Sequence, residues 1–302
     1  GAGKSWTLRR VLEQTRAHVQ QIIIDPEGEF RTYAKHFDLL VLDGAKLNAA
    51  ALAAAATRIR EHRVSALLDL SDLEREGQMK AAAAFVAALI DAPKEFWQPC
   101  IVVIDEVHLL APYGAQDGVA PAVRKASIAA VADLMNRGRK RGLAGVIATL
   151  RLAQLSKAVS FPVQNFMVGL NTQDIDIRRA SETIGWDARR GFDRLPMLTP
   201  GEFVVCGPAF SVQPCVVRVG AVESPHGGST PALTQAPKVR ADAAHALVDV
   251  DGLMQASADD EAVLEGGGLI VEGLKQVRKF VKDTAFLPAA RIYGALVPLA
   301  PD

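Results

Sequence analysis

Ile101-Val102-Val103-Ile104-Asp105-Glu106 is the stretch that decides how this chain folds. An unbroken β-branched run of this length is typical of a strand that helices cover on both faces, as in a parallel sheet. Two acids follow it at the carboxyl edge, where such sheets bind their ligands. We expect Asp105 to hold the water shell of Mg²⁺ and Glu106 to polarise an attacking water. The alternative is a strand that simply ends in two hydrated carboxylates.

A phosphate-binding motif opens the chain, roughly one hundred residues before the two acids. Gly1-Ala2-Gly3-Lys4-Ser5 matches the second half of the pattern G-x-x-x-x-G-K-[ST], in which backbone N–H groups and a helix N-terminus surround phosphates. In this interpretation Lys4 reaches the β- and γ-phosphates, Ser5 shares Mg²⁺ with Asp105, and Trp6 begins the helix that faces the nucleotide. A chance Gly/Lys/Ser turn is the alternative for the half-motif alone. The first glycine and the strand before it are missing, so we expect the sequence to begin inside a longer protein.

The rest of the first 220 residues alternates short β-branched runs with amphipathic stretches. This pattern predicts an α/β domain with a mostly parallel sheet flanked by helices. The expected strands are residues 22–24, 39–42, 66–70, 101–104, 146–149 and 166–169. The expected helices are residues 47–62, 78–90, 122–139 and 174–184. Residues 203–206 and 215–219 predict a closing hairpin.

Composition restricts the partners more than the fold. Of the 302 residues, 49% are hydrophobic, which is enough to bury a large core. The 34 basic residues balance 34 acidic ones, so any contact with nucleic acid or a membrane surface must be local. The three cysteines are far apart and form no zinc motif, which predicts a reducing cytoplasm. No apolar stretch reaches the roughly 20 residues of a membrane span.

Two further segments place polar groups after expected strands. The turn Asp25-Pro26-Glu27-Gly28-Glu29-Phe30 carries three acids, and we expect Asp25 or Glu27 to face the nucleotide. A hydrated surface turn is the alternative. Thr149 ends the strand expected beside Asp105, where its hydroxyl either senses the γ-phosphate or only caps the strand.

Cations gather at the end of the helix expected over residues 122–139. The run Asn136-Arg137-Gly138-Arg139-Lys140-Arg141-Gly142 suits the negative end of a helix dipole. Two sharper hypotheses compete with that role: an arginine finger for a neighbouring subunit, with Arg139 and Arg141 as candidates, or phosphate contacts to DNA. His108 either couples nucleotide state to the next loop or packs. Arg178 and Arg179 either reach across a subunit boundary or are solvated.

The composition changes after the expected hairpin. Residues 221–240 collect proline, glycine, serine and threonine with few large apolar residues, which predicts a linker. It would join a domain of residues 1–220 to a small helical tail of residues 241–302. The tail shows no catalytic spacing and stops in an apolar segment, so we expect truncation there as well.

Together these motifs resemble the HerA-like branch of the HerA/FtsK superfamily of RecA-like P-loop ATPases. Many ATPases share the phosphate loop and Asp105-Glu106. The turn from Asp25 to Phe30, and Gly138-Arg139-Lys140-Arg141-Gly142 before Ala148-Thr149, are similar to this branch in particular. The resemblance spans nearly all of residues 1–220, and conjugative type IV secretion ATPases share much of it.

The resemblance implies a hexameric ring that hydrolyses ATP with Mg²⁺ to move DNA, double-stranded in the first instance, with a nuclease or another effector as partner. A secretion ATPase at the inner membrane is one alternative. A nucleotide-binding switch that does not hydrolyse is another, because the family has a glutamine where this chain has Leu150. The lost amide puts the coupling of hydrolysis to movement in question.

Overall fold

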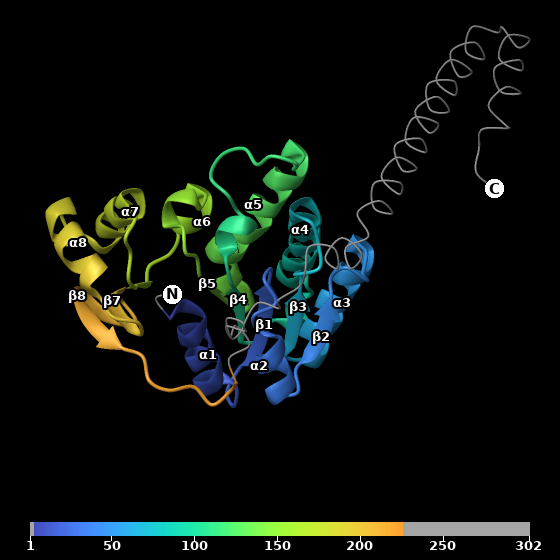
Figure 1. Cartoon of the computed structure of the whole chain (residues 1–302). Helices are drawn as coiled ribbons and strands as arrows, with labels where there is room; N and C mark the ends of the chain where they lie inside the picture. Colours follow the sequence, from blue (N-terminus) through green and yellow to red (C-terminus); the bar gives the residue numbers. More distant parts are fainter. Residues whose placement is uncertain (1–2, 226–302) are drawn as a thin grey trace, which may run out of the picture. The chain divides into compact units, whose positions relative to one another are not determined.

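Helices cover both faces of a five-stranded parallel sheet (Figure 1). The computed structural model describes residues 3–225, so the expected helical tail and most of the expected linker lie outside the described residues. The strand order is β2-β3-β1-β4-β5. These strands are β1 (Gln20–Asp25), β2 (Leu40–Asp43), β3 (Ala66–Asp69), β4 (Cys100–Ile104) and β5 (Leu143–Ile147).

A smaller antiparallel sheet follows in the order β6-β7-β8, with β6 at Phe166–Val168, β7 at Glu202–Gly207 and β8 at Ser211–Arg218. The α-helices are α1 (Lys4–Thr15), α2 (Arg31–His36), α3 (Ala49–His62), α4 (Arg75–Asp91), α5 (Pro121–Arg137), α6 (Lys157–Ser160), α7 (Asp174–Ile184) and α8 (Ala188–Arg194). Single 3₁₀ turns are η1 (Lys94–Phe96), η2 (Val107–Leu109), η3 (Gly138–Arg141), η4 (Leu152–Gln154) and η5 (Leu195–Met197). Within residues 3–225 we find no helix with the length and apolar character that crossing a bilayer requires.

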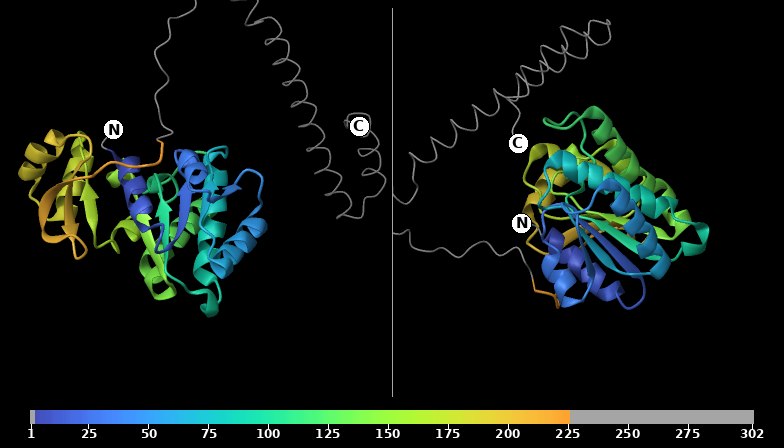
Figure 2. Two further views of the ribbon diagram at one scale, coloured as in Figure 1. Left: turned by 90° about the horizontal axis from the view of Figure 1, so that it is seen from below. Right: turned by 90° about the vertical axis from the view of Figure 1, so that its right-hand side faces the viewer.

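Helices lie on both faces of the parallel sheet (Figure 2). The side chains of each strand alternate between two core layers, one on each face. Ile22 and Ile24 of β1 face the layer formed with α3, α4 and α5, whereas Ile23 between them faces α1 and α2. The neighbouring strands alternate in the same way, because successive side chains of a strand point to opposite faces. Both faces are therefore dry, which explains why β4 consists of apolar residues throughout.

Acids end four neighbouring strands at one edge of the sheet. β2, β3 and β1 finish at Asp43, Asp69 and Asp25, and Asp105 follows β4 directly. Asp25 and Asp69 are partners in the register of β1 and β3. The helix α1 begins at Lys4, and the Lys4 side chain reaches Asp105 at this edge. The candidate site therefore lies between the sheet edge and the first turn of α1.

The structure confirms the mostly parallel sheet but shifts two expected strands. β5 spans Leu143–Ile147 instead of residues 146–149, because the left-handed Gly142 (φ +78°) ends η3 and starts the strand earlier. Thr149 consequently lies beyond the strand end. Residues 166–168 form β6, which pairs antiparallel with β7 and belongs to the smaller sheet.

A C-terminal strap, residues 219–225, lies against α1. Glu13 accepts hydrogen bonds from the N–H groups of Glu223 and Ser224, at 2.9 Å each, and from the Ser224 hydroxyl at 2.7 Å. Arg9 is fully buried and donates to the Ser224 hydroxyl at 3.2 Å and to the Pro225 carbonyl at 3.0 Å. The first five residues of the expected linker are therefore bound to the domain.

We predict that Glu13→Ala releases the strap, because three donors lose their acceptor at once. The expected result is cleavage by a protease between residues 219 and 225 at roughly ten times the wild-type rate, since local opening governs proteolysis. The measurement is limited proteolysis followed by mass spectrometry. Glu61→Ala, an exposed carboxylate on α3, is the control and should cleave like the wild type; equal rates in both variants would contradict the prediction.

Candidate functional site

The start of α1 packs against Gly201, the residue just before β7 of the antiparallel sheet. Gly3 caps the helix in a left-handed conformation (φ +89°), and a Cβ atom there would lie 3.2 Å from the backbone nitrogen of Gly201. Only glycine combines that backbone with this close approach. Gly1 and Ala2 lie outside the described residues. The start of α1 therefore places the N–H groups of a helix N-terminus beside Lys4 and Ser5, as an anion site requires.

Lys4 brings the phosphate motif and the two acids together, as the sequence predicted. Its ammonium forms an ion pair and hydrogen bond with the Oδ1 atom of Asp105 and lies 3.2 Å from the Oε1 atom of Glu106. Burial lowers the pKa of Lys4, but the two carboxylates outweigh that effect and leave its pKa above the usual value. Lys4 is thus a permanent cation at the carboxyl edge of β4.

Asp105 uses one carboxylate oxygen for hydrogen bonds, and its other oxygen has no partner among the described residues. Its Oδ1 atom accepts from Lys4 and from the N–H of Glu106 at 2.9 Å, whereas the buried Oδ2 atom has no partner among the described residues. Burial raises the pKa of Asp105 against the opposing effect of Lys4. An unpartnered buried carboxylate oxygen is costly unless a cation or a water meets it.

That free oxygen makes the site suitable for Mg²⁺. Mg²⁺ is usually held by one or two protein oxygens together with waters and substrate phosphates. Asp105, and Ser5 in the first turn of α1, provide that number of ligands. Among residues 3–225 no group of three His, Cys, Asp or Glu side chains forms a metal cage. The donor set thus fits a phosphate-bound Mg²⁺ and not an all-protein site.

Glu106 is held by three donors in an uncommon backbone conformation (φ +41°, ψ +46°). Its Oε1 atom faces Lys4, and its Oε2 atom accepts from the N–H of Leu150 at 3.1 Å and lies 3.2 Å from the Nδ1 atom of His108. Burial raises the pKa of Glu106, but His108, Lys4 and the Leu150 amide bring it below the usual value. A left-handed non-glycine residue costs on the order of 1–3 kcal/mol, and these contacts hold it in place.

His108 links Thr149 to Glu106, because it contacts both side chains. The Oγ1 atom of Thr149 is 2.9 Å from the Nδ1 atom of His108 and also accepts from the N–H of Arg151 at 3.0 Å. The chain pairing continues past the strands, since Val107 donates to the Ala148 carbonyl at 2.9 Å. His108 therefore contacts both the acid and the threonine, which places it inside the site.

Leu150 contributes its backbone and not its side chain. The N–H group binds Glu106, while the isobutyl group is 57% exposed. The contact to Glu106 therefore does not depend on the side chain at position 150.

Asp25 holds a turn. Its Oδ1 atom accepts from the N–H groups of Glu27 at 3.2 Å and Gly28 at 2.9 Å, and its Oδ2 atom accepts from Phe30 at 2.7 Å. The side chain is fully buried, whereas Glu27 is exposed. Both oxygens of Asp25 thus accept hydrogen bonds from the turn that the sequence predicted, and the contact of Asp25 or Glu27 with a nucleotide stays a prediction.

The remaining sequence candidates differ in how tightly they are held. Arg141 donates to the Ile90 carbonyl, pairs with Asp91 at 3.0 Å and stacks on Trp97 at 5.5 Å. Arg139 is exposed and forms no ion pair within the described part of the chain. The Trp6 indole donates to the Gly220 carbonyl at 2.9 Å, in the strap.

The sequence interpretation missed Gly201 and the amide of Leu150. The only sequence signal for Gly201 is the turn-forming pair Pro200-Gly201 before a strand, which predicts a turn but not its packing on Gly3. Backbone donors such as Leu150 leave no residue-type signal.

No family model matches the chain, and no curated protein matches it. Solved structures do share its fold. VirB4 of Thermoanaerobacter pseudethanolicus matches with a TM-score of 0.54 at 13% identity, over 74% of this chain and 87% of VirB4. The DNA-packaging ATPase B204 of Sulfolobus turreted icosahedral virus matches with a TM-score of 0.47 at 13% identity, over 74% and 93% of the two chains.

The genome-packaging NTPase B204 of Sulfolobus turreted icosahedral virus 2, in complex with ATP-γ-S, matches with a TM-score of 0.47 at 15% identity, over 71% and 90% of the chains. At 13% identity the likeness to VirB4 establishes the fold alone. That fold is the P-loop NTPase fold which the family resemblance predicted.

The buried Asp25 gives a test by pH. Burial raises its pKa to about 6, from 3.8, with further contributions from Asp105 and Asp69. Between these values the folded protein binds a proton that the unfolded chain has released, so stability falls as the pH rises through this window. The shift corresponds to roughly 2–3 kcal/mol.

We predict that this fall is absent in Asp25→Asn, whose side chain does not titrate. The measurement is the free energy of unfolding in urea at pH 4, 5, 6 and 7 for both proteins. The wild type should lose stability relative to the variant as the pH rises. Parallel pH dependences would show that Asp25 keeps an ordinary pKa.

Proposed function

We propose that this chain is a Mg²⁺-dependent ATPase that acts in a ring and uses ATP hydrolysis to move DNA. The observation that carries the proposal is the meeting of Lys4, Asp105 and Glu106 at the carboxyl edge of a parallel sheet. The fold shared with VirB4 supports it. ATP and Mg²⁺ are the proposed cofactors, and double-stranded DNA is the proposed polymer.

The residues divide the work of phosphoryl transfer between them. The N–H groups of the first turn of α1 and the ammonium of Lys4 would hold phosphate oxygens, and Asp105 and Ser5 would hold the metal. Mg²⁺-ATP supplies the electrophilic phosphorus and the leaving group. Glu106 orients a water and accepts its proton, which its lowered pKa permits because the carboxylate is ionised at neutral pH.

Lys4 has to exchange its partners for this chemistry. The ammonium that now neutralises Asp105 and Glu106 is the same group that a γ-phosphate would attract. Its transfer to the phosphate would free Asp105 for the metal and leave Glu106 with His108 and the Leu150 amide. The contacts of Lys4 therefore neutralise the two acids, and the same ammonium would serve the phosphate.

We include a ring in the proposal because, among the described contacts, no arginine of this chain pairs with Asp105 or Glu106. In a ring, a neighbouring subunit would supply the arginine finger. Arg139 is the better candidate for an arginine finger, because it is exposed, whereas Arg141 is bound to Ile90 and Asp91. A secretion ATPase of the same fold would use the same chemistry. The switch hypothesis has less support, since Leu150 binds Glu106 through its backbone.

We predict that Glu106→Gln lowers kcat by at least roughly a hundredfold while ATP still binds, because the amide cannot accept a proton from water. The measurement is steady-state ATP hydrolysis with and without double-stranded DNA, together with equilibrium binding of ATP. Glu61→Gln is the control, since Glu61 is exposed on α3 and belongs to neither the phosphate motif nor the acidic turn. Turnover in Glu106→Gln within a few-fold of the wild type would overturn the assignment of the base.

A second prediction separates Leu150 from His108. Leu150→Gln should keep DNA-independent turnover within about twofold of the wild type, because the N–H that binds Glu106 is unchanged. His108→Ala should lower kcat roughly tenfold with little effect on KM, since His108 contacts the base and positions it. His108→Asn, which retains a side-chain donor, should recover part of the loss. The opposite order of effects would show that the leucine side chain governs the site.

A further inference from the structure

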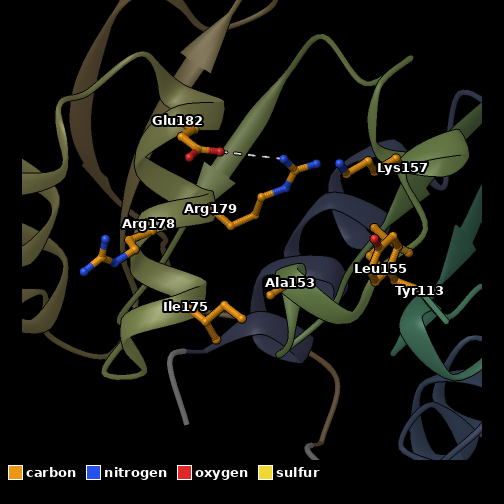
Figure 3. A pocket seen from close by; sticks show the side chains of 8 residues that line it. All are labelled: Tyr113, Ala153, Leu155, Lys157, Ile175, Arg178, Arg179 and Glu182. Carbon is orange, nitrogen blue, oxygen red and sulfur yellow. Dashed lines mark ion pairs between the residues drawn. The ribbon is translucent and has the colours of Figure 1, made fainter.

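A hollow of about 260 Å³ lies between α7 and the segments that follow β4 and β5 (Figure 3). Tyr113 and Lys157 line one side, and Ile175, Arg179 and Glu182 of α7 line the other. None of these side chains takes part in the contacts of Lys4, Asp105 and Glu106 described above. The hollow is thus a second candidate site on the same domain.

The charges in the hollow favour an anion. Figure 3 shows the ammonium of Lys157 and the guanidinium of Arg179 directed toward each other. Glu182 is the one carboxylate in the lining; it lies 3.7 Å from Arg179, and its side chain is 71% exposed. Lys157 is exposed and has no ion pair among residues 3–225. Two cations facing each other across open space are best satisfied by a shared anion, such as a phosphate.

Arg178 takes no part in this anion site. Both arginines lie near an aromatic ring, Arg178 at 5.5 Å from Phe192 and Arg179 at 5.9 Å from Phe161. They differ in direction, since the guanidinium of Arg178 points away from Lys157 in Figure 3. The proposed anion contacts are therefore restricted to Lys157 and Arg179.

Apolar surface adjoins the two cations. The ring of Tyr113 is 62% exposed and Ile175 is 66% exposed, both unusually high for large side chains at the rim of a hollow. An exposed aromatic ring beside cations is the arrangement by which proteins bind a nucleic-acid strand, with the base stacked on the ring and the phosphate on the cations.

Two segments that line the hollow follow Glu106 and Thr149 in the chain. The chain leaving Glu106 and the chain leaving Thr149 pair with each other: Tyr113 donates to the Gln154 carbonyl at 2.6 Å, and Ser156 donates to the Ala111 carbonyl at 2.9 Å. The first turn of α7 joins them, since Asp176 accepts from the N–H of Ala153 at 2.9 Å. A ligand in the hollow therefore touches elements that extend directly from the base.

We propose that this hollow binds one phosphate and the adjoining base of a DNA strand, with Lys157 and Arg179 on the phosphate and Tyr113 on the base. The inference rests on the proposed function and assigns part of its DNA contact. Through the pairing of residues 111–113 with 154–156, occupancy of the hollow adjusts the segment that positions Glu106. DNA should then stimulate ATP turnover through these residues.

The test uses the whole chain and a fluorescently labelled oligonucleotide, with affinity measured by anisotropy between 50 and 200 mM salt. Lys157→Ala should weaken binding roughly tenfold near 0.1 M salt and reduce the salt slope by about 1, because one phosphate contact is lost. Tyr113→Ala should weaken binding roughly tenfold with an unchanged salt slope, because stacking is not ionic. Lys157→Arg and the distant control Lys35→Ala should bind like the wild type.

ATP turnover separates this inference from the proposed function. Lys157→Ala and Tyr113→Ala should keep their DNA-independent turnover and lose most of the stimulation by DNA. If the wild-type protein hydrolyses ATP but binds no DNA, the proposed function as a DNA motor is wrong, and the proposed role of the hollow is wrong as well.

Three other results would overturn the hollow's role alone. One is wild-type affinity in both variants, and another is a loss in Lys35→Ala equal to that in Lys157→Ala. The third is unchanged DNA binding with a smaller species in analytical ultracentrifugation, which would make the hollow a contact between subunits.

Discussion

The ion pair between Lys4 and the two acids after β4 is the interaction on which the rest of the site depends. Asp105 and Glu106 are adjacent and nearly buried, at 1% and 9% exposure, so their charges repel in a medium that screens poorly. One ammonium contacts both of them. Because Lys4 starts α1, this ion pair also fixes the N-terminus of that helix over the sheet edge and thereby sets where a phosphate group would lie.

Elements whose sequence pattern has one physical cause were predicted well. The β-branched run of β4 and its two acids gave the parallel sheet and the site, because a strand covered on both faces admits only apolar residues. Lys4 was expected near Asp105 from motif chemistry alone. In contrast, the start of β5 depends on Gly142, whose Cβ would lie 2.5 Å from the Gln98 carbonyl oxygen, and this close approach has no signal in the local pattern.

The turn after β1 shows that an acidic motif can also serve the local backbone. Three acids near a nucleotide site suggest a role with the ligand, yet Asp25 uses both oxygens for backbone N–H groups of its own turn. Acidic side chains favour such turns for that reason. Contacts made by backbone groups, such as Leu150 with Glu106 or the strap with Glu13, were equally out of reach of residue-type reasoning.

The strap connects elements that lie far apart in the sequence. It follows β8 directly, and Arg9 and Glu13 bind it on the helix whose first turn carries Lys4. Lys4 and Glu13 are nine positions apart, which is about 13–14 Å along a helix axis. A displacement of β8 would therefore be transmitted to the phosphate-binding turn through α1, and also through Gly201, whose carbonyl accepts from the N–H of Val219.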